Sequence, residues 1–235
     1  SSDLFDHPER NAEEAYRDIS DKLRNLSFPL LFLSRLKNIE FEFENVLGLY
    51  GKEIVTSRRF DDTIAEHIRL TQNNGDDLYD ENLWLFSRLD DLSRRYSVGF
   101  FLDEKGQLRP INEPAFCFFP TKEVTKLNFI VHAPFLLTDS REGIRAGVPH
   151  NDIMLQHLAD LAADAMVYLR DIGSNSTIRL ITDNIVNIIP IDGERFSDPT
   201  DKRKVSFLPF YNSIKNKFAT EALLPAIDGY VASAN

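Results

Sequence analysis

The sequence predicts an α+β protein built on a mixed β-sheet with helices packed against it. Three observations predict this class: the alternation IEFEFE at residues 39–44, the nearly continuous apolar runs at 115–120 and 128–137, and one apolar stripe over 151–170. A period of two indicates a strand with one solvent-facing side. Continuous apolar runs suit strands covered on both faces, whereas three- and four-residue spacing indicates a helix. We therefore expect strands and helices to share a core.

The segments before residue 115 contribute the opening helix and most of the expected sheet. Polar clusters such as QNNGDD mark the connections, and apolar spacing marks the elements. In chain order we expect a helix over 11–26, the strand at 39–44, a turn near Gly48 and Gly51, a strand over 49–60, a polar loop over 61–82, a strand over 82–89 and a hairpin over 97–111.

The segments after the long helix differ in composition from those before it. Gly173 is suited to end that helix, and the next residues mix short β-like pieces with Ser, Asn, Asp and Pro. A further helix is expected over 209–223, and the closing LLPAIDGYVASAN is interpreted as a turn and a strand without a partner, cut from a longer protein. We expect a larger α/β domain over 1–172 and a smaller α/β segment over 173–235.

Composition and charge exclude several classes of protein. The formal net charge of −10 argues against a general nucleic-acid binder, which needs clustered Lys and Arg. The basic run at 202–204 lies among acidic residues, so we interpret it as a solvated loop, with an anion site as the alternative. Cys117 is the single cysteine, which excludes an intrachain disulfide and a zinc site built on paired cysteines. No membrane-length apolar run or signal peptide is visible, so we expect a cytosolic protein.

No complete catalytic motif is present in the sequence. GLYGKE at 48–53 lacks the spacing and the Ser or Thr of a phosphate-binding loop, and we expect a turn there. His157, Asp160 and Asp164 lie three and four residues apart on one face of the expected long helix, which would allow a metal site or a hydrolase. The ordinary alternative is that these residues form the solvated side of an amphipathic helix.

The segment LLTDSREGI, residues 136–144, combines a charged cluster with the preceding apolar run NFIVHAPF. An arginine at the end of a core strand, here Arg141, has two interpretations. It could form a solvated ion pair with Glu142, or it could be held rigidly for a phosphate or carboxylate supplied from outside the chain. The residues alone leave both interpretations open.

Four stretches together resemble a known family: AEEAYRDISDKLRNLSFPLLFLSRLKNIEF, AFCFFPTKEVTKLNFIVHAPFLLTDSREGI, LQHLADLAADAMVYL and EALLPAIDGYVASAN. They are similar to the region that follows the ATP-binding domain in sacsin-like proteins, which are large GHKL ATPases related to the ninety-kilodalton heat-shock chaperone. The likeness covers most of residues 12–172 and 221–235, and it is most specific in FFPTKE and HAPFLLTDSREGI. It implies a fold like the middle-domain α/β sandwich of that chaperone family.

The resemblance implies a role for the segment around Arg141. In the chaperone family, the domain after the nucleotide site carries a Leu-Ser-Arg-Glu motif whose arginine reaches the γ-phosphate of ATP in the preceding domain. The sequence DSRE at 139–142 looks like that motif, which makes Arg141 the expected phosphate contact, supported by Thr138, Glu142 and Arg145. Thr138 stands where the family has asparagine and Arg145 where it has glutamine, so the second polar contact departs from the family pattern.

The same resemblance implies cofactors and partners outside the chain. ATP and Mg²⁺ are expected in an upstream ATP-binding domain, because the magnesium-binding helix and the Asp-x-Gly-x-Gly turn of a GHKL pocket do not occur here. We expect no cofactor or metal within the chain and no ATP hydrolysis by the chain alone. The implied function is a transducer that couples nucleotide state to domain movement, with Lys122 or Lys126 as a weaker helper. The alternative is a protein-interaction module of the same fold that holds a client or partner through exposed aromatic residues.

Overall fold

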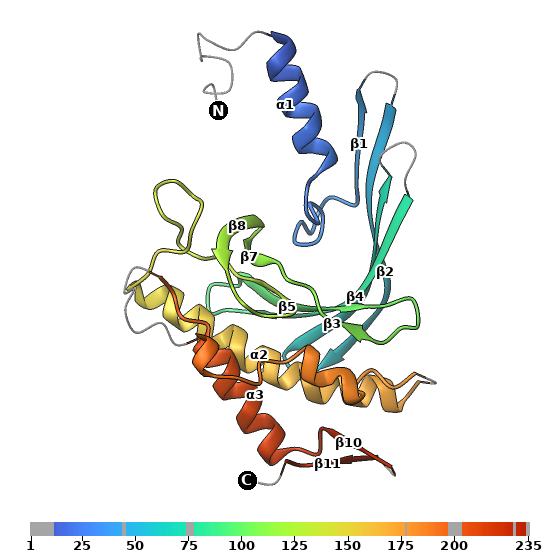
Figure 1. Ribbon diagram of the computed structural model, residues 1–235, viewed down its shortest axis with the longest axis vertical. Coiled ribbons are helices and arrows are strands. Elements are labelled where there is room, and N and C mark those ends of the chain that lie inside the picture. Colours follow the sequence, from blue (N-terminus) through green and yellow to red (C-terminus); the bar gives the residue numbers. More distant parts are fainter. Residues whose placement is uncertain are drawn as a thin grey trace. The chain divides into compact units, whose positions relative to one another are not determined.

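The computed structural model describes residues 12–43, 46–73, 78–176, 178–196, 204–227 and 229–233. These residues form three α-helices, one large mixed sheet and a separate two-stranded hairpin near the end of the chain (Figure 1). The predicted α+β class, a mixed sheet with packed helices, is confirmed.

Helices and strands alternate little along the chain, because most strands precede the second and third α-helices. The α-helices are α1 (Ala12–Arg24), α2 (Pro149–Ser174) and α3 (Leu208–Thr220), and two short 3-10 helices are η1 (Asp183–Asn187) and η2 (Glu194–Phe196). The strands are β1 (Asn38–Phe43), β2 (Val46–Phe60), β3 (Thr63–Asn73), β4 (Leu78–Leu89), β5 (Arg95–Leu102), β6 (Leu108–Arg109), β7 (Pro114–Cys117), β8 (Phe119–Val124), β9 (Ile130–His132), β10 (Leu224–Ala226) and β11 (Gly229–Val231).

The described residues divide into two compact units, namely unit 1 within Ser1–Lys52 and Leu70–Asp80, and unit 2 within Glu53–Arg69 and Glu81–Asn235. In unit 1, Tyr50 on β2 fixes the end of α1. Its hydroxyl donates to the Leu23 carbonyl at 2.7 Å and accepts from the Leu26 N–H at 3.3 Å. All residues of the predicted site belong to unit 2.

The large sheet is mixed because one strand pair runs parallel. Its strand order is β1-β2-β3-β4-β5-β9-β7-β8, with β6 paired to β5. Strand β9 pairs antiparallel with β5, where Val131 lies opposite Val98, and parallel with β7, where His132 lies opposite Phe116. Strand β8 returns along β7 and forms one edge of the sheet. The short strand β9, which leads into residues 133–145, is therefore interior to the sheet.

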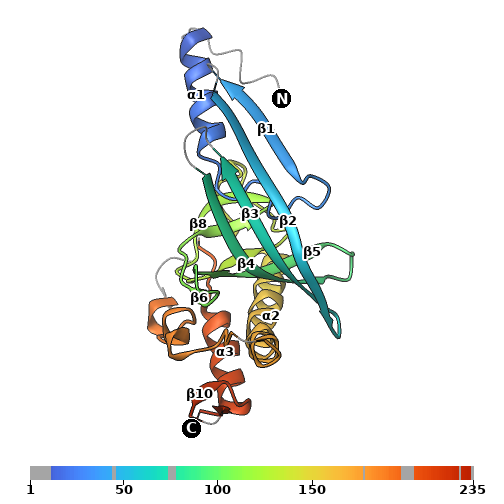
Figure 2. The same ribbon diagram turned by 90° about the vertical axis from the view of Figure 1, so that its right-hand side faces the viewer.

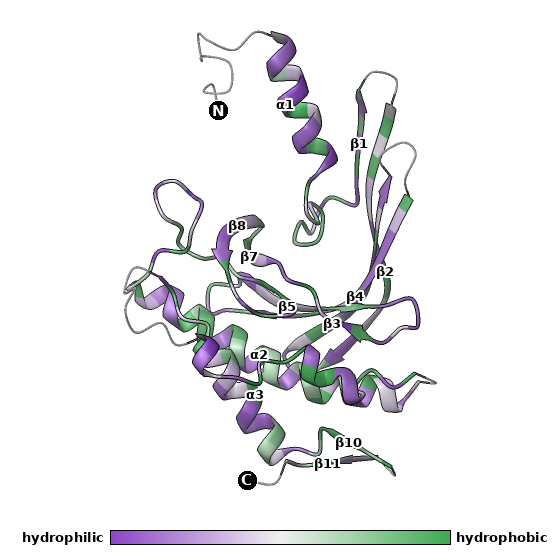
Figure 3. Ribbon diagram, in the orientation of Figure 1, coloured by the Kyte–Doolittle hydropathy of each residue, from purple (hydrophilic) through white to green (hydrophobic). Residues whose placement is uncertain are grey.

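The core of unit 2 lies between the sheet and the helices α2 and α3. Helix α2 packs against β5, and α3 packs along α2 (Figures 1 and 2). Apolar positions recur along both helices among polar ones (Figure 3), and the apolar stripe predicted for α2 is largely buried. The Phe129 ring centroid lies 4.9 Å from that of Phe100 on β5 and 6.0 Å from that of Phe210 on α3. Buried aromatic rings of this kind supply much of the apolar area that holds such layers together.

The polar stretch expected to be a loop over 61–82 is largely strand. Strand β3 occupies most of it and β4 begins at Leu78, so the prediction of a loop was wrong. Strand β3 buries Ala65, Ile68 and Leu70, and it lies between β2 and β4 in the sheet. Pairing on both sides thus outweighs the weak local preference of its polar residues for strand.

The turn expected near Gly48 and Gly51 is also wrong, because both glycines lie inside β2. Gly48 pairs with Phe41 on β1, and a Cβ added at Gly48 would lie 2.1 Å from the Phe41 ring carbon Cζ. Glycine is needed at this position because the ring lies across the strand. The segment GLYGKE is therefore strand rather than turn.

The strands predicted to precede Arg141 also differ from those in the structure. The run at 115–120 is not one strand, because the chain turns at Phe118, with φ +65°, between β7 and β8. Strand β9 ends at His132, so only three residues of the run 128–137 are strand. Pro134 has no N–H with which to continue the ladder. Arg141 therefore does not extend from a long strand.

The segment after α2 has a different structure from the one expected. The β-like pieces after residue 173 are the 3-10 helices η1 and η2, whereas the predicted helix near 209–223 is confirmed as α3. The closing strand does have a partner, since β10 pairs with β11. Residue 172 falls inside α2, and α2 and α3 belong to the same unit. Lys202 and Arg203 of the basic run lie outside the described residues.

Candidate functional site

Residues 136–145 form a closed loop, called the arginine loop here, between β9 and α2. Leu137 and Ile144 form an isolated antiparallel bridge at its base. The Thr138 N–H donates to the Gly143 carbonyl at 2.9 Å, and the Arg145 N–H donates to the Leu136 carbonyl at 2.9 Å. These bonds bring the two ends of the loop together, so the tip around residue 141 projects from a hydrogen-bonded base.

Arg141 lies at the tip with an exposed side chain and left-handed backbone, at φ +57°. Its N–H donates to the Thr138 carbonyl at 2.8 Å, which fixes the turn. A non-glycine residue in this backbone region is uncommon and persists where the surrounding structure determines it. Among the described residues, the guanidinium of Arg141 has no hydrogen-bond or ion-pair partner. The loop therefore presents a cation that the described residues of this unit do not pair.

The acidic neighbours of Arg141 pair with other cations. Glu142 Oε1 accepts from Lys122 Nζ at 2.5 Å, and Asp139 Oδ1 accepts from Arg145 Nη2 at 2.6 Å. The alternative interpretation of the sequence, an ion pair between Arg141 and Glu142, is therefore wrong. Both observed pairs are exposed, but they offset the two carboxylates closest in sequence to Arg141.

The base of the arginine loop is held from one side by Asn151 in the first turn of α2. Asn151 is fully buried, and its Oδ1 accepts from the Leu136 N–H at 2.9 Å. Its Nδ2 donates to the Leu136 carbonyl and to the Arg145 carbonyl, each at 2.8 Å. Pro149 at the first helical position suits the start of α2, because its missing N–H is not needed there. One side chain thus joins both ends of the loop to the long helix.

Strand β8 holds the other side of the loop. The Lys122 N–H donates to the Glu142 carbonyl at 2.5 Å, and Glu123 Oε2 accepts from the Ile144 N–H at 3.2 Å. Both contacts reach the arm of the loop that follows Arg141, at Glu142 and Ile144. Because Lys122 also pairs with the Glu142 side chain, β8 contacts the loop through backbone and side chain together.

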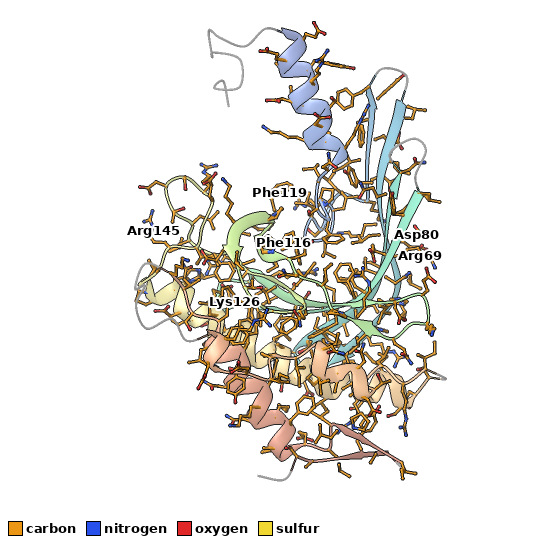
Figure 4. All side chains as sticks on the ribbon, viewed as in Figure 1. Arg69, Asp80, Phe116, Phe119, Lys126 and Arg145 are labelled. Atoms are coloured by element: carbon orange, nitrogen blue, oxygen red, sulfur yellow. The ribbon has the colours of Figure 1, made fainter. Side chains whose placement is uncertain are left out.

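The other predicted site residues act within the structure. Thr138 Oγ1 accepts from the Gly143 N–H at 3.2 Å and lies 3.1 Å from Ser140 Oγ, so the hydroxyl stabilises the turn. Lys126, after β8, donates from Nζ to the Arg195 carbonyl at 2.9 Å. Lys126 and Arg145 are both labelled in Figure 4. Thr138, Glu142 and Arg145 are thus gathered around Arg141, whereas Lys126 contacts the segment around η2.

Two cavities lie near the end of β8, and both are lined in part by Lys126 just after the strand. One, of about 340 Å³, is lined mainly by residues 186–192 with Lys126 and Arg195, and the other, of about 240 Å³, by residues 122–126 with Phe196 and Phe207. Neither cavity is lined by Arg141. A ligand of Arg141 would therefore have to reach it from outside these cavities.

The acidic face of α2 uses its charges inside the protein. Asp164 lies between Arg88 Nη2 at 2.8 Å and Lys217 Nζ at 2.7 Å, so its carboxylate joins β4, α2 and α3. Burial alone would raise the pKa of Asp164, but hydrogen bonds from Lys217 and Arg88 outweigh it and hold that pKa below its usual value. Asp160 accepts from Gln156 Nε2 and from Ser213 Oγ, each at 2.9 Å.

His157 does not join these carboxylates in a ligand set. Its ring centroid lies 5.6 Å from that of Tyr96. Within the part of the chain that the structure describes, no group of three or more His, Cys, Asp or Glu side chains is placed to hold a metal ion. The described helices also include none that is long and apolar enough to cross a membrane.

Sequence reasoning missed Asn151 and Glu123 as parts of the site. Both act through contacts with the loop, at separations of 15 and 21 residues for Leu136 and Ile144 respectively. The available signal for Asn151 was a polar residue just inside a proline-started helix that is otherwise apolar on its inner face. That pattern is typical of a buried amide with a defined partner.

Comparison with known proteins gives a partial similarity. The chain is 32% identical over 143 residues to the protein NO VEIN of Arabidopsis thaliana. The match covers 58% of this chain and 5% of NO VEIN, so the chain spans a small part of that protein's length. No protein family and no solved structure matches the chain. The similarity therefore relates a segment of the two proteins and does not assign a family.

Proposed function

We propose that this chain is the transducer, or middle, domain of an ATP-dependent, chaperone-like GHKL ATPase of the sacsin-like type. In this proposal Arg141 contacts the γ-phosphate of ATP bound with Mg²⁺ in an upstream domain, and the chain couples nucleotide state to domain movement in the cytoplasm. The observation that carries the proposal is the arginine loop, where Arg141 is exposed on a hydrogen-bonded base and has no partner among the described residues.

The chemistry of a guanidinium suits this role. Arginine stays charged, and its planar donors match the oxygens of a phosphate group. A donor that is already fixed in position stabilises developing charge on a transferring phosphoryl group without having to reorganise. Arg141 is mounted between α2 and β8, and its acidic neighbours are paired elsewhere.

A cation on a separate domain also makes catalysis conditional. If ATP is bound by another domain, Arg141 contributes only when that domain closes onto the arginine loop, and closure of this kind gates many enzymes. The mixed sheet with packed helices is compatible with a middle-domain sandwich of the heat-shock chaperone type, and that finer likeness is part of the proposal. Thr138, Glu142 and Arg145 would act by shaping the loop.

The test is steady-state ATP hydrolysis by the ATP-binding domain joined to this chain, with Arg141 changed to Ala and to Lys. We expect Arg141→Ala to lower kcat by about 10²- to 10³-fold. Arg141→Lys should recover only part of that loss, because an ammonium lacks the planar fork. The matched control is Arg58→Ala on β2, another exposed arginine, which should leave kcat unchanged. Equal rates for Arg141→Ala and the unchanged chain would refute the proposal.

A second candidate function is a protein-interaction module of the same fold. One observation favours it: the β7–β8 hairpin exposes about half of Phe118 and Phe119 and 66% of Val124, whereas Phe116 on the same hairpin is buried (Figure 4). Exposed aromatic side chains in a group are typical of binding surfaces. In that case Phe119→Ser would abolish the activity of the whole protein, and Arg141→Ala would leave it intact.

A further inference from the structure

The first turn of α2 contacts the arginine loop through two side chains. His150 Nε2 lies 3.0 Å from the Pro134 carbonyl, just before the loop. Asn151, the next residue, makes the contacts with Leu136 and Arg145 described above. Helix α2 is 26 residues long and packs on the sheet and on α3. The loop is therefore attached to the most extensively packed helix of the unit.

The Asn151 amide matches its surroundings in hydrogen-bonding type. It faces one N–H and one carbonyl of Leu136 and one carbonyl of Arg145, so the site needs one acceptor and two donors. A carboxamide supplies both, whereas an ionised carboxylate only accepts. With zero exposed area, Asn151 has no access to water that could replace a lost partner.

Both ends of the loop contact this one side chain, in addition to the backbone hydrogen bonds that join the ends to each other. The Leu136 contacts lie on the strand-side end and the Arg145 contact on the helix-side end, with Arg141 between them. A change at Asn151 would therefore alter how the joined ends are held against α2, and with it the direction in which the tip points. The contacts from Lys122 and Glu123 reach only the helix-side arm of the loop, at Glu142 and Ile144, and do not join its two ends.

We propose that Asn151 is a positioning residue for Arg141, a role that rests on the proposed function. Asn151 touches neither nucleotide nor reacting atoms. It sets the geometry of the loop base so that the guanidinium is presented in one direction when the ATP-binding domain closes. Displacement of a positioned group by about 1 Å costs up to about 10²-fold in rate.

The test compares Asn151→Asp with Asn216→Asp, which makes the same amide-to-acid change at an exposed position on α3. Hydrogen exchange by mass spectrometry on the full chain follows peptides that cover residues 134–146. We expect exchange in these peptides to rise at least about tenfold in Asn151→Asp and not in Asn216→Asp, since the Leu136 N–H loses its defined geometry. Steady-state ATP hydrolysis is then measured in the joined ATPase, where we expect kcat to fall about 10²-fold with KM for ATP unchanged.

The outcomes separate this inference from the proposed function. Faster exchange with a lower kcat supports both. Faster exchange with an unchanged kcat, while Arg141→Ala is also without effect, supports the positioning of the loop and refutes the ATPase role. Unchanged exchange refutes the positioning role whatever the rate, and so does a normal kcat in Asn151→Asp when Arg141→Ala lowers it. If Asn151→Asp does not fold by circular dichroism, Asn151→Ala, which adds no charge, replaces it under the same criteria.

Discussion

The arginine loop and the acidic face of α2 carry the two groups of charged residues that the sequence offered for chemistry, and they use their charges in opposite ways. On α2, Asp164 has two cationic partners from β4 and α3, and Asp160 has two hydrogen-bond donors. At the loop tip, the Arg141 guanidinium has no ion-pair or hydrogen-bond partner among the described residues, although the neighbouring carboxylates of Asp139 and Glu142 are both paired.

The difference shows that availability, rather than residue type or spacing, separates a candidate site from a structural network. Arg88 and Asp164 are mostly shielded from solvent, with 13% and 28% of their side-chain areas exposed, and each satisfies the other. Their charges stabilise packing between elements. Arg141 is exposed, and among the described residues its guanidinium has no ion-pair or hydrogen-bond partner, so its charge stays available to a group from outside these residues.

The largest expected difference in stability between the two regions comes from removing one charge from each. Asp164→Ala leaves the Arg88 guanidinium with less compensation in a shielded position, and we expect a loss of about 2–3 kcal/mol in the free energy of unfolding. Arg141→Ala should change it by no more than about 0.5 kcal/mol. Urea unfolding of both variants measures this.

Asp91→Ala, at an exposed turn position, serves as the control for loss of a carboxylate. Similar losses for Asp164→Ala and Arg141→Ala would break the comparison, since Arg141 would then be a structural charge.

The two regions should also respond to different ranges of pH. The pKa of Asp164 is held below its usual value, so its contribution to stability is present above about pH 4 and is lost only as pH falls further. His132, on the strand before the arginine loop, has its pKa lowered to about 3, by burial and to a smaller extent by Arg95. The contribution of neutral His132 to stability is complete above about pH 6.5, the pKa of the imidazole in the unfolded chain. It is lost as pH falls from there toward 3.

From about pH 7.5 to about pH 5.5, we therefore expect the free energy of unfolding to fall by about 1.4 kcal/mol through His132. The pKa of His67 is also lowered, by burial and then by Arg69, and adds a loss of the same sign. His132→Gln should be less stable at neutral pH but should lose most of this pH dependence, whereas His67→Gln should keep the part that His132 contributes. A His132→Gln variant with the full pH dependence would show that another group titrates.

Part of the fold and the site followed from the sequence because some signals are local. The alternation at 39–44 and the stripe of α2 reflect periods of two and 3.6 residues that burial imposes directly. Strand β3 was missed because its strand state depends on pairing with β2 and β4 rather than on its own composition. The length of the strand in the run 128–137 was overestimated, because the end of β9 is set by its pairing with β5 and β7 rather than by its composition.

The site shows the same limit. Arg141 was identifiable from its setting after an apolar run, but its neighbours were not. Glu142 pairs with Lys122, 20 residues away, rather than with Arg141 beside it. Asn151 is part of the site only because the folded chain places both ends of the loop against it. Contacts of this kind depend on the return path of the chain, which a local pattern does not encode.

The smallest expected effect concerns the ion pair between Lys122 and Glu142. Both side chains are more than half exposed, so a double-mutant cycle with Lys122→Ala and Glu142→Ala should give a coupling of no more than about 0.5 kcal/mol, reduced further by added salt. The main role of Lys122 is then to hold the Glu142 carboxylate away from Arg141. On that reading, Lys122→Ala should weaken the function of Arg141 more than it weakens folding, because Glu142 becomes free to compete for the guanidinium. The double variant should restore that function, because the competing carboxylate is gone. A coupling well above 1 kcal/mol would instead make the pair a structural element like Arg88 and Asp164, and the contrast between the two regions would narrow.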